Sequence, residues 1–126
     1  MIGDEADVLE ADSQNEADEA DAPERAVRCA ACRHVLTTRA ARIRVRGAHA
    51  HTFKNPAAID FLIGCYGSAP GCRGMGETSS VWTWFPGFSW QIALCGSCVE
   101  HVGWLFARAD TEKRFVALIL DRILED

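Results

Sequence analysis

Residues 81–90 read VWTWFPGFSW and hold three of the four tryptophans in the chain. In an extended strand, alternation places Trp82 and Trp84 on the same face. The Pro-Gly pair that follows favours a tight turn, because proline presets φ and glycine readily takes a positive φ. The sequence therefore predicts a short hairpin in which Trp84 and Trp90 face each other across the turn.

The clustered indoles permit two interpretations. Tryptophan is a common core residue in small domains, where one side chain buries about 150–250 Å². Alternatively, Trp84 and Trp90, joined by Trp104 from the next predicted strand, form the walls of a pocket for a small flat molecule. Clustering around one tight turn, close to a metal-binding motif, favours the pocket.

Two Cys-x-x-Cys pairs, Cys29/Cys32 and Cys95/Cys98, are typical of a tetrahedral four-cysteine zinc site. Four protein ligands leave no open coordination position, so we expect one structural Zn²⁺ ion as the cofactor. A redox function of the pairs is the alternative. Ordinary zinc ribbons separate their pairs by about 15–20 residues. The much longer separation here predicts an ion that joins two sheets.

The N-terminal sequence and the cysteine content bear on the cellular compartment. The N-terminus is acidic and has no apolar signal segment, and no apolar run approaches the roughly 20 residues of a membrane span. We therefore expect a cytoplasmic protein with reduced thiols, in which cysteines serve as metal ligands before they form disulfides. Cys65 and Cys72 are outside the two pairs and are expected to be free thiols.

Acidic residues are concentrated at the N-terminus. Residues 1–24 hold ten acidic and no basic side chains, whereas the remainder holds thirteen basic and eight acidic ones. Such a segment buries too little apolar surface to fold alone. We predict a disordered acidic leader over residues 1–25 and one zinc-binding β domain over residues 26–126. The leader either keeps the protein solvated or shades a basic surface of its own domain.

Apolar patterns predict further strands. Ile43 and Val45 alternate with arginines, which indicates a half-buried strand with the arginines in water. Residues 59–66 and 101–106 are expected to be strands. Residues 115–124 fit a strand that becomes helical near its end.

Two other stretches predict loops. The glycine-rich residues 68–78 indicate an irregular loop without a phosphate-binding arrangement. His49 and His51 lie in a second predicted loop. They are possible metal ligands, although surface histidines are more common at such positions.

Together these motifs resemble the cereblon thalidomide-binding (CULT) domain family, and most closely its free-standing bacterial members. The resemblance covers residues 28–124. It is carried by both cysteine pairs, Asn55-Pro56, WFPGFSW at residues 84–90 and HVGWLF at residues 101–106.

The resemblance implies an all-β fold, a β-tent of two antiparallel sheets at a steep angle, pinned by a four-cysteine zinc site. It also implies a non-enzymatic binding site. Trp84, Trp90 and Trp104 match the three tryptophans of the family pocket, and Phe106 matches an aromatic residue that helps to close it. Family ligands are cyclic imides such as glutarimide, the head of thalidomide. Uridine-like rings and C-terminal cyclic imides on damaged proteins are proposed natural ligands.

The polar edge of an imide needs hydrogen-bond partners, because each buried unpaired group costs about 1–3 kcal/mol. The resemblance implies that the Trp82 carbonyl accepts from the imide N–H and that the Trp84 N–H donates to an imide carbonyl. It also implies that Asn55 leans over the pocket. Animal cereblons carry histidine at the Trp82 position, and Trp82 can lend a fourth wall here. The expected ligand-binding residues are Asn55, Trp82, Trp84, Trp90, Trp104 and Phe106.

Three other functions fit parts of the sequence. Methionine-sulfoxide reductases of the B type share the tent and the cysteine pairs, but they need a late nucleophilic cysteine and none follows Cys98. A cage for a methylated or quaternary ammonium ligand suits tryptophan, but residues 81–90 contain no carboxylate. A nucleic-acid binder would interleave basic and aromatic residues. We expect a monomer that binds cyclic imides and neither nucleic acid nor membranes.

Overall fold

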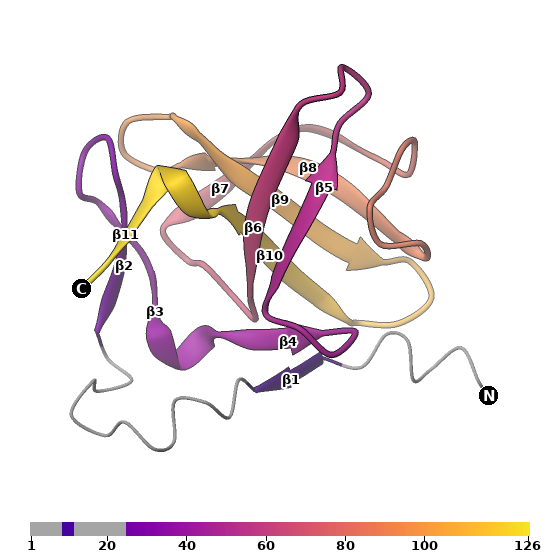
Figure 1. Ribbon diagram of the computed structural model, residues 1–126, viewed down its shortest axis with the longest axis horizontal. Coiled ribbons are helices and arrows are strands. Elements are labelled where there is room, and N and C mark those ends of the chain that lie inside the picture. The colour runs from indigo at the N-terminus through magenta and orange to yellow at the C-terminus, as the bar shows by residue number, and fades with distance from the viewer. Residues whose placement is uncertain (1–8, 12–24) are drawn as a thin grey trace.

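The computed structural model describes residues 9–11 and 25–126. Strands dominate the described part of the chain, and they form three antiparallel sheets (Figure 1). Their bounds are β1 Leu9–Ala11, β2 Ala26–Cys29, β3 Val35–Thr38, β4 Ile43–Val45, β5 Ala50–Lys54, β6 Asp60–Tyr66, β7 Cys72–Ser79, β8 Phe88–Cys95, β9 His101–Arg108, β10 Arg114–Ile119 and β11 Ile123–Glu125. Two 3-10 turns, η3 Arg39–Ala41 and η4 Leu120–Arg122, accompany them.

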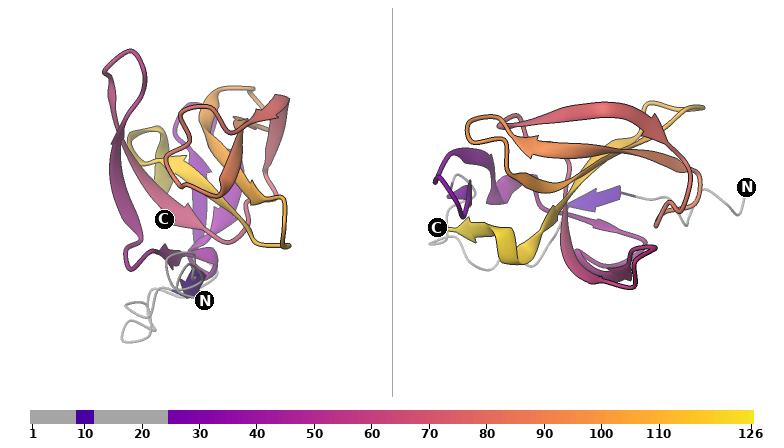
Figure 2. Two further views of the ribbon diagram at one scale, coloured as in Figure 1. Left: turned by 90° about the vertical axis from the view of Figure 1, so that its right-hand side faces the viewer. Right: turned by 90° about the horizontal axis from the view of Figure 1, so that it is seen from above.

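The largest sheet has six strands in the order β5-β6-β10-β9-β8-β7. The three-stranded sheet β11-β2-β3 lies at one end of it, and β1 pairs with β4. The β5–β6 hairpin stands away from β7, β8 and β9, so the six-stranded sheet is strongly bent (Figure 2). The predicted all-β class, with antiparallel sheets and a four-cysteine cluster, is confirmed.

The core has two parts because β10 is buried on both faces. Val116 and Leu118 pack into one cluster with residues of the three-stranded sheet, such as Val27. Phe115 and Ala117 alternate with them and therefore face the other way. They join a cluster that is rich in aromatic side chains, namely Phe85, Phe88 and Phe106, with Trp84, Trp90 and Trp104 packed against it.

The predicted hairpin at residues 81–90 is wrong in its first strand. Residues 80–87 form an irregular loop, and the preceding strand that pairs with β8 is β7, Cys72–Ser79. The predicted turn is present, since the N–H of Phe88 donates to the carbonyl of Phe85 at 2.9 Å and Gly87 has a φ of 94°. The tryptophans of the loop are therefore placed by turns and side-chain contacts, not by strand alternation.

The glycine-rich loop predicted over residues 68–78 is also wrong, because most of it is the edge strand β7. Glycine fits this strand for local reasons. A Cβ at Gly74 would lie 2.2 Å from the Gln91 side chain, and Gly76 has a φ of 79° where the β7–β8 register shifts. A β-bulge with a positive φ favours glycine at this place, whereas a glycine-rich composition by itself indicates a loop.

The other strand predictions agree with the structure. Residues 59–66 contain β6, and residues 101–106 lie within β9. Residues 115–124 run from β10 through η4 into β11, as the mixed pattern predicted. His51 lies on β5, not in a loop, and its Nε2 atom is 3.0 Å from the Val45 carbonyl oxygen.

The arginine row is less exposed than predicted. Arg44 and Arg46 are half-buried, and Arg46 donates to the Pro86 carbonyl at 2.8 Å. The Arg46 guanidinium also lies over the Phe85 ring, 5.5 Å from its centroid. This arginine therefore helps to hold the tryptophan-bearing loop.

Within the predicted acidic leader, Leu9–Ala11 form β1 and pair with β4. The rest of the leader lies outside the described residues. In the part of the chain that is described, no helix has the length and apolar character needed to cross a membrane.

Candidate metal centre and ligand pocket

The four paired cysteines meet between the two larger sheets. Cys29 and Cys32 lie at the β2–β3 turn of the three-stranded sheet, and Cys95 and Cys98 lie at the β8–β9 turn of the six-stranded sheet. Their four sulfur atoms lie within 4.8 Å of one another. The four-cysteine cluster therefore lies where a single metal ion would join the two sheets.

The sulfur spacing fits a tetrahedral ion. The Cys29 and Cys98 sulfurs are 3.7 Å apart, and the Cys32 and Cys95 sulfurs are 3.6 Å apart. Sulfurs bound about 2.3 Å from a tetrahedral centre are separated by about 3.8 Å. The thiols are therefore already arranged as a four-ligand site.

Both cysteine turns have the same backbone geometry. The N–H of Arg33 donates to the Cys29 carbonyl at 2.8 Å, and the N–H of Val99 donates to the Cys95 carbonyl at 3.0 Å. Arg33 and Val99 also have positive φ values, of 72° and 58°. This conformation is uncommon for residues other than glycine and is frequently held at functional sites. Here the positive φ lets the backbone of each turn wrap around its pair of thiols.

Backbone N–H groups also point at the sulfur atoms. The N–H of His34 donates to Cys32 and lowers the pKa of that thiol to about 7. The N–H of Glu100 donates to Cys98 at the corresponding place in the other turn, but there burial and the three neighbouring thiols outweigh this bond and raise the pKa of Cys98 to about 12. Such bonds favour the thiolate, which is the form that binds metal.

The two remaining cysteines are free thiols, as predicted. Burial raises the pKa of Cys65 and of Cys72 to about 12, so neither is an activated nucleophile. Cys72 pairs with Cys95 across the β7–β8 ladder, yet it is outside the group of four close sulfurs.

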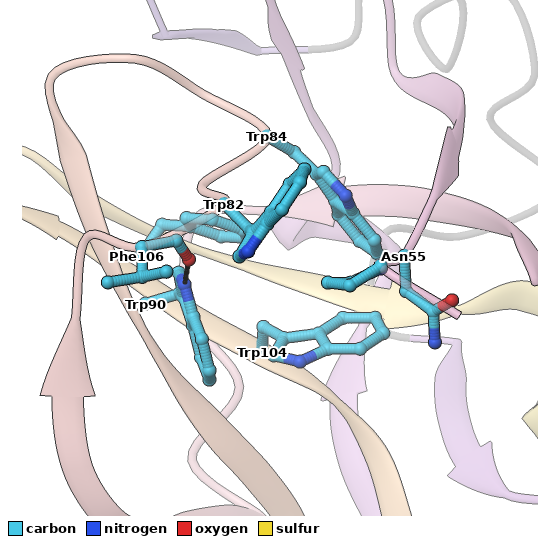
Figure 3. Close-up of a pocket in the computed structure, with 8 residues that line it drawn as sticks. Asn55, Trp82, Trp84, Trp90, Trp104 and Phe106 are labelled. Carbon is cyan, nitrogen blue, oxygen red and sulfur yellow. Dashed lines mark hydrogen bonds between the residues drawn. The ribbon is translucent and has the colours of Figure 1, made fainter. Parts of the chain in front are cut away.

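A pocket of about 250 Å³ lies away from the metal centre. All six residues predicted to bind ligand line it (Figure 3). The complete lining is Asn55, Pro56, Val81, Trp82, Trp84, Trp90, Trp104 and Phe106. Whether these residues bind a ligand remains a prediction.

Strand register brings two of the tryptophans together. Trp90 on β8 pairs with Phe106 on β9, and Ile92 pairs with Trp104. Trp90 and Trp104 are therefore diagonal neighbours on one face of the sheet. The indole N–H of Trp90 donates to the Val81 carbonyl at 2.8 Å, which ties the loop to this wall.

Trp84 is held by contacts from a different hairpin. Its ring stacks on Phe53 with centroids 5.0 Å apart, and it meets Trp104 edge-on at 4.7 Å. Its indole N–H donates to the Lys54 carbonyl at 3.2 Å. Phe61 adds a tilted contact at 6.1 Å. The β5–β6 hairpin thus holds in place the ring of Trp84, which the loop at residues 80–87 contributes as one wall of the pocket.

Asn55 lies at the turn between β5 and β6. Its side-chain oxygen accepts from the N–H groups of Ala57 and Ile59, both at 2.9 Å. The oxygen is therefore committed to the turn, and only the amide nitrogen can donate to a ligand.

Val81 and Pro56 complete the lining, and neither was among the predicted site residues. Pro56 was visible as part of the Asn-Pro pair, but it has no polar group that would mark it. Val81 lies in the segment predicted as a strand, so its place at the pocket edge depends on the loop. Its carbonyl oxygen, which accepts from Trp90, carries no sequence signal.

Charge and backbone polarity describe what the pocket can accept. None of its eight lining residues is charged. Among the described residues, neither the carbonyl oxygen of Trp82 nor the backbone N–H of Trp84 has a hydrogen-bond partner. An acceptor and a donor are therefore available beside aromatic walls.

Sequence comparisons point to one family. Protein cereblon of Drosophila grimshawi is 49% identical over 35 residues, and that of Drosophila melanogaster is 55% identical over 31 residues. Cereblon of Drosophila virilis is 52% identical over 31 residues. This stretch of the chain is therefore similar to part of cereblon. No family model matches the chain.

The cereblon-like match is short. It covers 28% of this chain for the Drosophila grimshawi protein and 25% for the other two. In each case it covers 5% of the relative's length. The activities of the complete relatives therefore do not transfer to this chain.

Proposed function

We propose that the domain binds small cyclic imides in the tryptophan pocket and does not catalyse a reaction. The observation that carries this proposal is the composition of the lining. Four indoles and one phenyl ring surround a pocket without charged side chains. Such walls suit a flat neutral ring, and they offer no carboxylate to balance a quaternary ammonium group.

The polar edge of an imide supplies two carbonyl acceptors and one N–H donor between them. The Trp82 carbonyl can accept from the N–H, and the Trp84 N–H can donate to one carbonyl. The amide nitrogen of Asn55 is a further donor at the rim. These groups offset the cost of removing the imide edge from water.

The metal in this proposal is zinc in a structural role. Four thiolates suit Zn²⁺, and the four of them leave no position for a substrate or an activated water. The ion supplies folding free energy and keeps the β8–β9 turn against the three-stranded sheet. Free thiols throughout the described domain fit a reducing compartment such as the cytoplasm.

Two sources of imide fit the proposal, a free small molecule and a cyclic imide at a protein C-terminus. Both present the same ring and the same acceptor-donor-acceptor edge. We propose that the protein binds its ligand as a monomer.

Calorimetric titration of the zinc-loaded protein with glutarimide and N-methylglutarimide tests the function. Methylation removes the imide donor and adds bulk at the same edge, while it keeps the ring. We expect glutarimide to bind and N-methylglutarimide to bind at least about tenfold more weakly, about 1.4 kcal/mol. Equal affinities, or preferential binding of trimethyl-lysine, would contradict the proposal.

A further inference from the structure

A second pocket, of about 510 Å³, lies on the opposite face of the six-stranded sheet from the tryptophan pocket. Side chains alternate along a strand, so Trp90 and Phe106 point to the tryptophan face while their neighbours Ser89 and Ala107 point to the other. Small-molecule sites in proteins commonly enclose about 300–1,000 Å³. We call this second pocket the groove, with β8, β9 and β10 as its floor and residues 67–70 as one wall.

Strand register builds the floor of the groove from two rows of side chains, each with one residue from β8, one from β9 and one from β10. The rows are Ser89-Ala107-Arg114 and Gln91-Leu105-Val116. The first row places a hydroxyl and a guanidinium on either side of a methyl group, so space remains between the two polar groups. The second row supplies apolar surface from Leu105 and Val116, which also pack in the core beside the three-stranded sheet. The floor is therefore polar along one row and mainly apolar along the other.

Hydrogen bonds hold the wall of the groove in place. Thr37 Oγ1 donates to the Ser68 carbonyl at 2.8 Å, and the N–H of Gly71 donates to the Leu36 carbonyl at 2.9 Å. Thr37 and Leu36 both belong to β3, so the three-stranded sheet fixes this loop against the larger sheet. Ala69 in the same loop is buried. The groove is therefore formed without a ligand.

Arg114 gives the groove its charge. It is the one charged residue in the lining, and it is exposed. Across the part of the chain that the structure describes, its side chain has no hydrogen-bond or ion-pair partner. The Gln91 amide nitrogen already donates to the Gly76 carbonyl at 2.6 Å, whereas the Ser89 hydroxyl makes only a long bond of 3.3 Å to the Ala107 carbonyl. An anion is therefore best received between Ser89 and Arg114.

We propose that the groove binds a small organic carboxylate with an apolar body. The carboxylate would accept hydrogen bonds from Arg114 and Ser89, and the apolar body would cover Leu105 and Val116. A doubly charged phosphate fits less well, because a single guanidinium lies in the lining. This site is separate from the proposed imide site, since neither floor row contributes a residue to the tryptophan pocket.

Nuclear magnetic resonance titration of the zinc-loaded protein with cyclohexylacetate and with its neutral amide, cyclohexylacetamide, tests the proposal. The two probes share one apolar body and differ in charge. The proteins are the parent chain, Arg114→Gln, Ala107→Leu and, as the matched control, Arg73→Gln, because Arg73 is exposed on β7 and lies outside the lining. Backbone N–H signals of the floor strands report on the groove, whereas the indole signals report on the tryptophan pocket.

We expect the parent chain to bind the carboxylate about 3- to 10-fold more tightly than the amide. This gain lies between that of an exposed ion pair and that of a hydrogen bond to a charged group. Arg114→Gln should remove the preference, and Arg73→Gln should keep it. Ala107→Leu should weaken the binding of both probes at least about tenfold, because the larger side chain fills the space between the polar groups.

Equal affinities of the two probes for the parent chain, or an unchanged preference in Arg114→Gln, would overturn the proposal. Shifts confined to the indole signals, or no shift with either probe at about 10 mM, would do the same. Groove signals that move with protein concentration alone would show that a second copy covers this face, which also overturns a small-molecule site. Glutarimide binding is independent of each of these outcomes.

Discussion

Replacing Cys95 by serine is expected to abolish cooperative folding of the domain at 25 °C. Cys95 is buried at the end of β8, and its sulfur lies 3.6 Å from that of Cys32 in the other sheet. Binding of a structural zinc ion contributes about 10–16 kcal/mol in zinc-finger peptides, whereas whole domains are stable by about 5–15 kcal/mol. Loss of one metal ligand should therefore remove most of the free energy of unfolding of the domain. Thermal unfolding followed by circular dichroism, with zinc content from native mass spectrometry, measures the effect.

Cys72→Ser is the matched control for this experiment. Cys72 lies directly across the β7–β8 ladder from Cys95 and undergoes the same chemical change. It is outside the group of four close sulfurs, so the variant should keep one zinc ion and lose only the roughly 0.5–3 kcal/mol typical of single substitutions. A Cys95→Ser protein that melts with the parent chain and retains a full equivalent of metal would show that the ion is dispensable.

Trp84→Ala is expected to weaken glutarimide binding by at least about tenfold, which corresponds to about 1.4 kcal/mol. The substitution removes one wall and its edge contact with Trp104, and it frees the loop that carries the Trp84 N–H. It also removes the ring that stacks on Phe53. Water should then reach the imide edge. Calorimetric titration of zinc-loaded protein gives the change in affinity.

Two variants separate a lost wall from general destabilisation. Leu62→Ala truncates an apolar side chain of β6 that is 51% exposed and is not part of the pocket lining, and it should bind glutarimide like the parent chain. Trp84→Phe keeps a ring and should retain part of the affinity. If Trp84→Ala folds, holds zinc and binds glutarimide normally, the pocket is not the site.

The sequence was sufficient to predict the four-cysteine cluster, because the geometry of a Cys-x-x-Cys turn is set locally by its own residues. A Cys-x-x-Cys turn places two sulfurs close together whatever lies around it, and both turns here have the same backbone hydrogen bonds. The strands at residues 59–66 and 101–106 were equally predictable, since apolar runs of that length are typical of buried strands.

The edge strand β7 could not be predicted in the same way. Its glycines serve close packing against Gln91 and a register shift, which depend on the neighbouring strand. Because β7 was not predicted, the strand over residues 88–95 was paired with residues 81–85 instead. The predicted tryptophan hairpin was therefore wrong in its first strand. Pairing between strands is a tertiary property that local composition does not contain.

The six predicted ligand residues nevertheless line one pocket, although Trp84 reaches it by a different route. The resemblance to a known family identified the residues, whereas alternation along a strand did not place them. Contacts from Phe53 and Phe61, and the bond to the Lys54 carbonyl, come from a hairpin about 30 residues earlier. Such contacts between distant segments cannot be predicted from a local sequence pattern.

The central claim is that an imide sits among the indoles, and the four indole N–H signals of the chain test it most directly. All four tryptophans line the pocket, so each signal reports on it. In a ¹⁵N-correlated spectrum of the zinc-loaded protein, saturating glutarimide should shift the signals of Trp84, Trp90 and Trp104, and a titration with N-methylglutarimide should need at least about tenfold higher concentrations to shift them to the same extent. Indole signals that stay in place at saturating glutarimide would contradict the account.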